Sequence, residues 1–286
     1  MTAVGQSKKH AVVFLHETLT KNASPRPALH ECDAGLFTLP PLAASISGAS
    51  GGMDGIMAES FEIGGKKIGL FGTDNEGSPL VILNTYSGEG ERVFRECALL
   101  GAKPFTLAAI SNLDWNADMT PWENPPIYKN GEPFSGKADE YLALLSSKII
   151  PAIMERLRAT PSYTAIAGYS LGGLFALYAS YKSGLFSRIA TASASLWFPR
   201  FLDFAQSQSF RRKPDAVYLS LGDAESKARN KTLATVQENA ERLFGILKGN
   251  GIAVQFELNA GNHFADCENR MAKAIGWILE HERKMG

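Results

Sequence analysis

Residues 163–183, YTAIAGYSLGGLFALYASYKS, carry the pattern that decides the fold. An apolar run over 163–167 leads into Gly168-Tyr169-Ser170-Leu171-Gly172, and a helical stretch over 171–183 follows and ends at Gly184. The pattern G-x-S-x-G between a strand and a helix predicts a very tight turn, where the serine takes strained backbone angles and small neighbours avoid a collision. Such a turn lifts the Ser170 hydroxyl above the sheet and leaves the Leu171 N–H at a helix N-terminus.

The same pattern occurs a second time, at Gly48-Ala49-Ser50-Gly51-Gly52. Ser50 has no apolar run before it and no helical pattern after it, so this stretch is interpreted as a loop. Ser170 has both, and its context therefore predicts a nucleophile.

Outward from this turn, short apolar runs alternate with helical patterns. Strands are predicted at 79–86, 104–110, 163–167, 187–194, 215–221 and 252–258, and helices at 89–101, 137–160 with a kink or boundary at Pro151, 171–183, 231–249 and 266–282. This alternation is typical of an α/β fold with a mostly parallel sheet and helices on both faces. In such sheets, reactive groups lie at the carboxyl ends of the strands.

The first part of the chain has a different texture. Residues 11–16, 55–63 and 67–72 are short extended pieces separated by turn-rich stretches. We therefore predict an N-terminal β-rich extension or cap over residues 1–77, packed on a catalytic domain over residues 78–286.

Composition excludes several classes of function. Lys plus Arg and Asp plus Glu both total 29, whereas a nucleic-acid-binding protein usually carries a basic excess. The first ten residues, MTAVGQSKKH, hold no long apolar core, and the run at 11–15 is too short for a signal sequence or a membrane span. Three cysteines imply no disulfide framework. These features predict a cytoplasmic protein that binds neither nucleic acid nor membrane.

The base that a serine nucleophile needs is found by elimination among five histidines. His10, His16 and His30 precede the nucleophile, and His281 lies in the charged tail. His263 lies between the last predicted strand and the last helix, where hydrolases with this turn keep their base.

The acid that orients the imidazole belongs after a strand between the nucleophile and the base. The predicted strand at 215–221 ends in Gly222-Asp223-Ala224-Glu225, so two carboxylates compete. We favour Glu225, because the acid often follows such a glycine by three residues, and keep Asp223 as the alternative.

The remaining site predictions concern the oxyanion donors, the substrate pocket and a metal. The loop after the strand at 79–86 suggests the Tyr86 N–H as a second oxyanion donor beside the Leu171 N–H, with Ser87 next. Residues 111–136 lack periodicity, and Trp115 and Trp122 there, with Trp197 farther on, are predicted to line a substrate pocket or else to anchor the loop. The group His263, Asp266, Cys267 and Glu268 matches no familiar zinc spacing, so neither metal nor cofactor is predicted.

Four segments carry a family resemblance: GYSLGGLFALYAS (168–180), SASLWF (193–198), GDAE (222–225) and GNHF (261–264). Together they resemble the putative-esterase branch of the α/β-hydrolases, which includes esterase D-like proteins and enterobactin-type siderophore esterases. The resemblance implies the α/β-hydrolase fold, with catalysis by Ser170, His263 and an acid at Glu225 or Asp223. It covers about residues 78–282.

The predicted reaction is cleavage of a small-molecule carboxylic ester, or a related acyl bond, through an acyl-enzyme on Ser170. Two alternatives stay open at this point. The same Ser–His site could pass the acyl group to an alcohol instead of water, or the chain could be a non-catalytic binding protein on the same fold. The sequence leaves the oligomeric state unknown.

Overall fold

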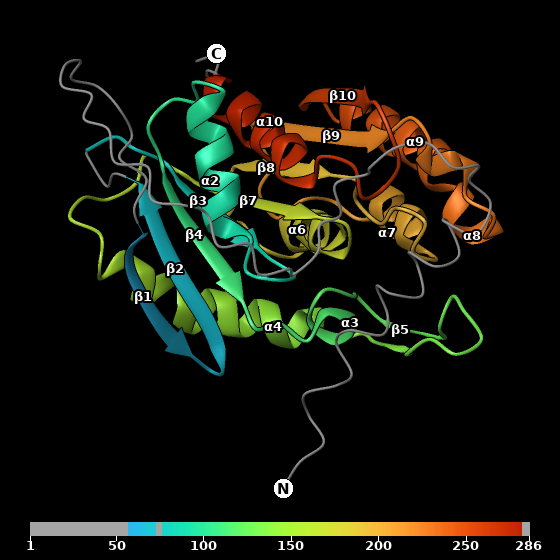
Figure 1. Ribbon diagram of the computed structural model, residues 1–286, viewed down its shortest axis with the longest axis horizontal. Coiled ribbons are helices and arrows are strands. Elements are labelled where there is room, and N and C mark those ends of the chain that lie inside the picture. Colours follow the sequence, from blue (N-terminus) through green and yellow to red (C-terminus); the bar gives the residue numbers. More distant parts are fainter. Residues whose placement is uncertain (1–56, 73–75, 282–286) are drawn as a thin grey trace, which may run out of the picture.

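The computed structural model describes residues 57–72 and 76–281, and within them an eight-stranded sheet forms the centre of the molecule (Figure 1). The strand order is β1-β2-β4-β3-β7-β8-β9-β10. The strands are Met57–Ile63 (β1), Lys66–Gly72 (β2), Leu80–Asn84 (β3), Thr106–Ser111 (β4), Thr164–Tyr169 (β7), Arg188–Ala192 (β8), Ala216–Gly222 (β9) and Ala253–Asn259 (β10). From β4 to β10 across the sheet all pairs are parallel, and β2 and β1 add antiparallel pairs at one edge. The mostly parallel sheet is confirmed.

Two layers of helices cover the sheet. The helices are Gly90–Leu99 (α2), Trp115–Asp118 (α3), Ala138–Leu144 (α4), Ile150–Met154 (α5), Leu171–Lys182 (α6), Phe201–Ser207 (α7), Lys231–Ala234 (α8), Val236–Gly249 (α9) and Cys267–Glu280 (α10). In β3, Leu80 and Ile82 belong to the hydrophobic cluster that includes residues of α4, α6 and α9, whereas Val81 and Leu83 belong to the cluster on the opposite face, with residues of α2 and α10. Because helices cover both faces of such a strand, apolar residues occupy successive positions, and the sequence shows a continuous apolar run instead of an alternating pattern.

The long helix predicted over 137–160 is interrupted near Pro151. A π-helical turn, Leu145–Ile149, separates α4 from α5, and Pro151 is the second residue of α5. Proline lacks an N–H and cannot continue the helical hydrogen-bond ladder, so a proline is accommodated where a new helical turn begins. The helix ends at Met154, earlier than predicted.

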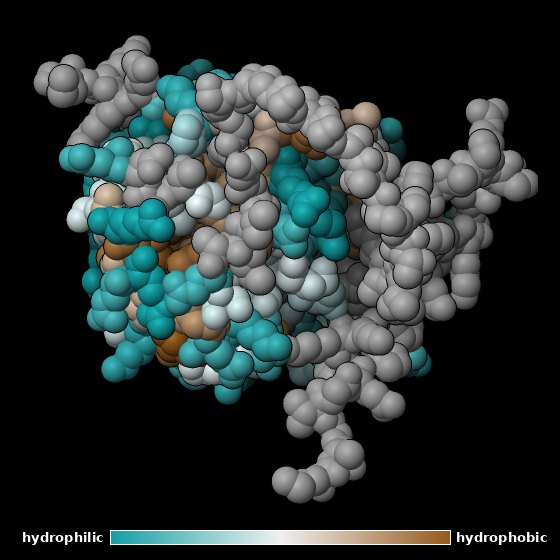
Figure 2. All heavy atoms as spheres, turned by 60° about the vertical axis from the view of Figure 1, so that its left-hand side comes forward, coloured by the Kyte–Doolittle hydropathy of each residue, from teal (hydrophilic) through white to brown (hydrophobic). Residues whose placement is uncertain are grey.

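The described part of the N-terminal segment joins the main sheet. β1 and β2 form a hairpin through Gly64 and Gly65, both at positive φ, and β2 pairs with β4 from Lys67↔Ser111 to Gly72↔Thr106. Figure 2 views the molecule from this side, where most of the coloured surface is hydrophilic and hydrophobic atoms form small patches. The strand predicted at 11–16 and the Ser50 motif lie outside the described residues, and the domain boundary at residue 77 stays a prediction.

Within residues 57–72 and 76–281, every helix is too short or too polar to span a lipid bilayer.

Candidate active site

The carboxyl ends of neighbouring parallel strands bring the predicted site residues to one edge of the sheet. Ser170 directly follows β7, and Glu225 and His263 lie in the loops after β9 and β10. The register pairs Tyr169 with Ala192 and Gly222 with Asn259, so these strand ends lie level with one another. Loops separated by long stretches of sequence therefore meet here.

The turn at Ser170 has the strained geometry that the motif predicts. Ser170 has φ 56° and ψ −123°, outside the regions that non-glycine residues favour. A side chain at Gly168 would place its Cβ 2.2 Å from the backbone carbon of Gly172, and one at Gly173 would lie 2.9 Å from the Cβ of Ala194. The glycines let strand β7, helix α6 and the loop after β8 approach closely enough to hold the serine in this conformation.

The structure brings Ser170, His263 and Glu225 into a hydrogen-bonded line. Ser170 Oγ lies 3.0 Å from His263 Nε2, and His263 Nδ1 lies 2.8 Å from Glu225 Oε2. The Tyr169 hydroxyl donates to the His263 carbonyl oxygen at 2.7 Å, and the Tyr169 ring packs edge-on against the imidazole. The histidine is thereby held by its main chain, its ring face and both ring nitrogens.

Glu225 is the buried carboxylate of this line. Burial raises the pKa of its carboxyl, but the neighbouring His263, the Ser193 hydroxyl and the Gly222 N–H outweigh that effect, and the net pKa is lowered. The Ser193 hydroxyl and the Gly222 N–H both donate to Oε1 at 2.6 Å. Glu225 is therefore ionised at neutral pH and acts only as an acceptor.

The ionised carboxylate fixes the histidine tautomer. Because Glu225 accepts the bond from Nδ1, the ring hydrogen of neutral His263 lies on Nδ1. Nε2 is left without a hydrogen and accepts the hydrogen of the Ser170 hydroxyl. This is the arrangement in which a histidine can remove a proton from a serine.

Asp223, the alternative acid, has a different position. Its side chain is exposed and its Oδ1 accepts a hydrogen bond from the Gly261 N–H at 3.0 Å, while its own N–H donates to the Asn259 carbonyl oxygen. Asp223 thus ties the loop after β9 to the loop that carries His263.

Three residues of the site were missed by sequence reasoning. Ser193 contacts Glu225, Ser195 Oγ lies 3.2 Å from Ser170 Oγ, and Arg270 Nη1 lies 3.7 Å from Glu225 Oε1. The side chain of Arg270 is 2% exposed, although it shares a helix with the apolar positions of α10. A lone arginine among apolar positions was the signal available, because a buried cation needs partners.

The two predicted oxyanion donors differ in their surroundings. Leu171 is the first residue of α6, so its N–H has no acceptor within the helix and lies at the positive end of the helix dipole. The Tyr86 N–H donates to Glu89 Oε1 at 3.1 Å, and the Ser87 N–H donates to Glu89 Oε2 at 2.8 Å. The role of Tyr86 stays a prediction, and it requires the Glu89 carboxylate to give up this bond.

The three predicted tryptophans occupy different places. Trp115 lies beside the nucleophile turn: its ring packs edge-on against Tyr86, and its Cη2 would lie 3.1 Å from a Cβ at Gly172. Trp122 donates from Nε1 to the Pro199 carbonyl oxygen at 3.0 Å, and so fastens the 111–136 loop to the segment after β8. Trp197 is half-buried and packs against Phe134 and Phe198. Substrate binding by these rings stays a prediction.

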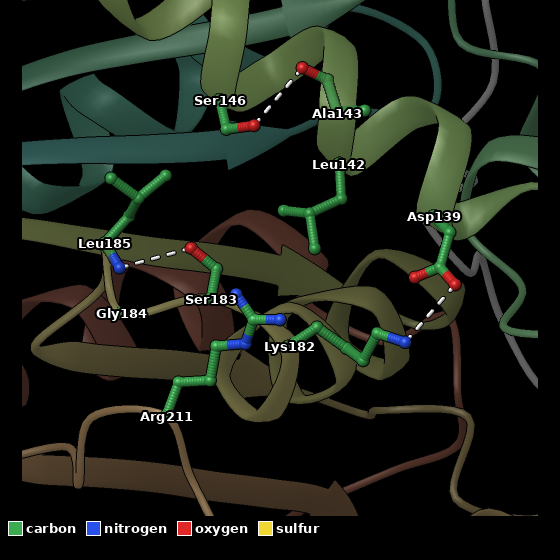
Figure 3. A pocket seen from close by; sticks show the side chains of 9 residues that line it. All are labelled: Asp139, Leu142, Ala143, Ser146, Lys182, Ser183, Gly184, Leu185 and Arg211. Atoms are coloured by element: carbon green, nitrogen blue, oxygen red, sulfur yellow. Dashed lines mark hydrogen bonds and ion pairs between the residues drawn. The ribbon is translucent and has the colours of Figure 1, made fainter.

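A surface hollow of about 530 Å³ lies away from this site (Figure 3). It is lined by residues of α4 and by the turn after α6, with Lys182 paired to Asp139 at 3.3 Å. Ser170 precedes the first residue of α6, and the helix of 12 residues is about 18 Å long, so its two ends are far apart. The hollow cannot present a substrate to Ser170.

Metal ligands do not gather in the part of the chain that the structure describes: there, no group of three or more His, Cys, Asp or Glu side chains is arranged to hold an ion.

The chain is similar to known proteins in both sequence and structure. The sequence profile of the family described as "Putative esterase" matches residues 88–268, which include Ser170, Glu225 and His263. The chain is similar in structure to the siderophore hydrolase EstB from Aspergillus nidulans, with a TM-score of 0.59 and 20% identity over 78% of this chain and 94% of that one. It is also similar to an IroE-like serine hydrolase from Shewanella oneidensis, with a TM-score of 0.62 and 17% identity over 75% and 76% of the two chains. At these identities the solved structures establish a shared fold.

Proposed function

Because the chain belongs to the Putative esterase family, we propose that it is a serine esterase that hydrolyses a carboxylic ester through an acyl-enzyme on Ser170. The observation that carries the proposal is the hydrogen-bonded line from Ser170 Oγ through His263 to Glu225, with distances of 3.0 and 2.8 Å. The strained serine at a helix N-terminus and a buried, ionised acid both support it.

Acylation begins when Ser170 Oγ attacks the carbonyl carbon of the ester while its proton passes to His263 Nε2. The positive charge on the imidazolium is stabilised by Glu225 across the Nδ1 hydrogen bond. The Leu171 N–H, and the Tyr86 N–H once Glu89 releases it, stabilise the negative oxygen of the tetrahedral intermediate. The intermediate collapses, His263 returns the proton to the departing alcohol, and the acyl group remains on Ser170.

Deacylation follows the same path with water as the nucleophile. His263 takes a proton from water as the water oxygen attacks the acyl carbon. Ser170 Oγ is now the leaving group and recovers its proton from His263, and the carboxylic acid departs. The Asp223 carboxylate, bound to the Gly261 N–H, holds the histidine loop beside the acid throughout.

The test is hydrolysis of p-nitrophenyl esters of graded acyl length by the full chain and by Ser170→Ala. We expect turnover to fall by at least about a thousandfold, because the nucleophile and base act as a unit. Ser50→Ala removes the serine of the other G-x-S-x-G sequence and is the matched control, expected to react at the wild-type rate. A fluorophosphonate probe should label the wild type and Ser50→Ala but not Ser170→Ala. Full activity in Ser170→Ala would show that the nucleophile lies elsewhere.

A further inference from the structure

Two serines in the segment after β8 contact opposite ends of the catalytic line. Ser193 Oγ donates to Glu225 at 2.6 Å, and Ser195 Oγ lies 3.2 Å from the nucleophilic oxygen of Ser170. Ser195 is 1% exposed, and its main-chain N–H donates to the Ser170 carbonyl oxygen at 3.0 Å. Ser195 is therefore fixed against the nucleophile by its backbone as well as by its side chain.

The direction of the bond between the two hydroxyls follows from counting hydrogens. Ser170 has one hydroxyl hydrogen, and its oxygen has two close partners, His263 Nε2 and Ser195 Oγ. In neutral His263 the ring hydrogen lies on Nδ1 and is bound to Glu225, so Nε2 can only accept. The Ser170 hydrogen therefore points to Nε2, and the hydrogen between the two serines belongs to Ser195.

We propose that Ser195 is a further catalytic residue, whose hydroxyl donates a hydrogen bond to Ser170 Oγ and stabilises the negative charge that develops there. The inference rests on the proposed function, because it takes Ser170 as the nucleophile. Among the residues that the structure describes, Ser170 Oγ is the hydrogen-bond partner of the Ser195 side chain. A buried hydroxyl aimed at the reacting oxygen is pre-oriented, so little reorganisation accompanies the charge change.

Ser195 donates this hydrogen bond in both halves of the reaction cycle. During acylation its hydrogen bond strengthens as the proton of Ser170 moves to His263 and charge builds on Oγ. During deacylation Ser170 Oγ leaves the acyl carbon and carries negative charge until His263 returns the proton, and the same hydrogen bond stabilises it. The Ser195 proton stays on Ser195 in both steps.

The experiment compares Ser195→Ala with the wild type in hydrolysis of p-nitrophenyl acetate and in the rate of fluorophosphonate labelling of Ser170. We expect kcat and the labelling rate to fall together by about tenfold, in keeping with the loss of one hydrogen bond to a charged oxygen, while KM changes by less than about twofold. Ser180→Ala is the matched control, since Ser180 is a buried serine of α6 whose hydroxyl donates to the Leu177 carbonyl oxygen, and it should keep the wild-type rates.

Ser195→Cys separates hydrogen bonding from packing, because a thiol fills a similar volume but is a weak donor. It should also be slowed, and it decides the matter if circular dichroism shows that Ser195→Ala does not fold. A folded variant, alanine or cysteine, with wild-type kcat and labelling rate would overturn the role of Ser195. Absence of hydrolysis and labelling in the wild type would instead overturn the proposed function itself.

Discussion

At the scale of single residues, the ionisation of Glu225 links the site to the stability of the chain. The carboxyl is buried, yet its pKa is lowered because His263, Ser193 and Gly222 surround the charged form with partners. A carboxyl with a lower pKa in the folded state than in the unfolded state stabilises the fold above its ordinary pKa. That contribution is lost as pH falls through the folded-state value.

We therefore predict that Glu225→Gln removes a pH-dependent part of the folding free energy. The wild type should be more stable than the variant at pH 7. The difference should shrink as pH falls below the ordinary glutamate pKa of about 4.3, and it should be smallest below the lowered pKa of the folded state, where Glu225 is protonated in both states. Urea unfolding of both proteins at a series of pH values measures this. Glu62→Gln changes an exposed glutamate of β1 and is the control. A difference that grows on acidification would contradict the assignment.

Ser170 and His263 could be named from the sequence as a candidate nucleophile and base, and the structure places them 3.0 Å apart. Ser170 lies in a turn with a strict glycine requirement, and His263 was found by elimination among the histidines. The choice between Glu225 and Asp223 depends on which way a loop turns, and spacing favours Glu225 only weakly. Ser195 and Arg270 escaped prediction because their residue types do not indicate their partners: the fold alone brings Ser195 to Ser170 and Arg270 to the histidine loop. Glu89 escaped as well, since nothing in its residue type indicates a bond to the Tyr86 N–H.

At the scale of elements, the approach of strand β7 to helix α6 depends on Gly168. A methyl group there would lie 2.2 Å from the main chain of Gly172, and backbone cannot rotate away as a side chain can. The nucleophile turn is thus a packing constraint as well as a chemical one.

We predict opposite effects for two Gly→Ala substitutions. Gly168→Ala should destabilise the fold by about 3 kcal/mol and abolish esterase activity, because overpacking must push α6 away from β7. Gly245→Ala should stabilise the fold by about 1 kcal/mol, since Gly245 lies within α9 with open space around its Cβ position. Thermal unfolding followed by circular dichroism compares the two. Equal effects would show that the close contact at Gly168 can relax.

The elements differ in how far the sequence could predict them. Buried strands such as β3 and β9 were predicted because both of their faces are covered and nearly every position is apolar, Asn84 and Ser220 being the polar exceptions. The helix over 137–160 was predicted too long because α5 already ends at Met154, whereas the boundary expected at Pro151 falls at the start of α5, directly after the π turn. The short α3, β5 (Glu123–Asn124) and β6 (Phe134–Ser135) within 111–136 were missed, because few residues and no period define them.

At the scale of the whole molecule, Arg270 ties the last helix to the site. Its guanidinium donates to the carbonyl oxygens of Ala260 at 2.7 Å and Asn262 at 2.9 Å, on either side of Gly261 in the histidine loop. Helix α10 packs on the sheet beside α2, so this loop is held by the core of the protein as well as by its neighbours.

We predict that the wild type loses activity and secondary structure together as urea is raised, because the histidine loop is fastened to α10. In Arg270→Met the carbonyl oxygens of Ala260 and Asn262 lose their donor and the buried Glu225 loses a nearby cation, which should cost about 3 kcal/mol. The residual activity of the variant should then vanish at a lower urea concentration than its circular dichroism signal. Coincident midpoints in the variant would show that the loop is held without Arg270.

The segment from Ser111 to Gly136 reaches the nucleophile turn through Trp115 without contributing any of the three residues proposed to be catalytic. It contributes α3 and the β5–β6 pair and is fastened by Trp122 to Pro199, yet none of Ser170, Glu225 and His263 comes from it. Exchanging this one surface segment would therefore leave the hydrogen-bonded line from Ser170 to Glu225 in place. Under the proposed function, substrate preference could then change without a change in the reaction that Ser170, His263 and Glu225 carry out.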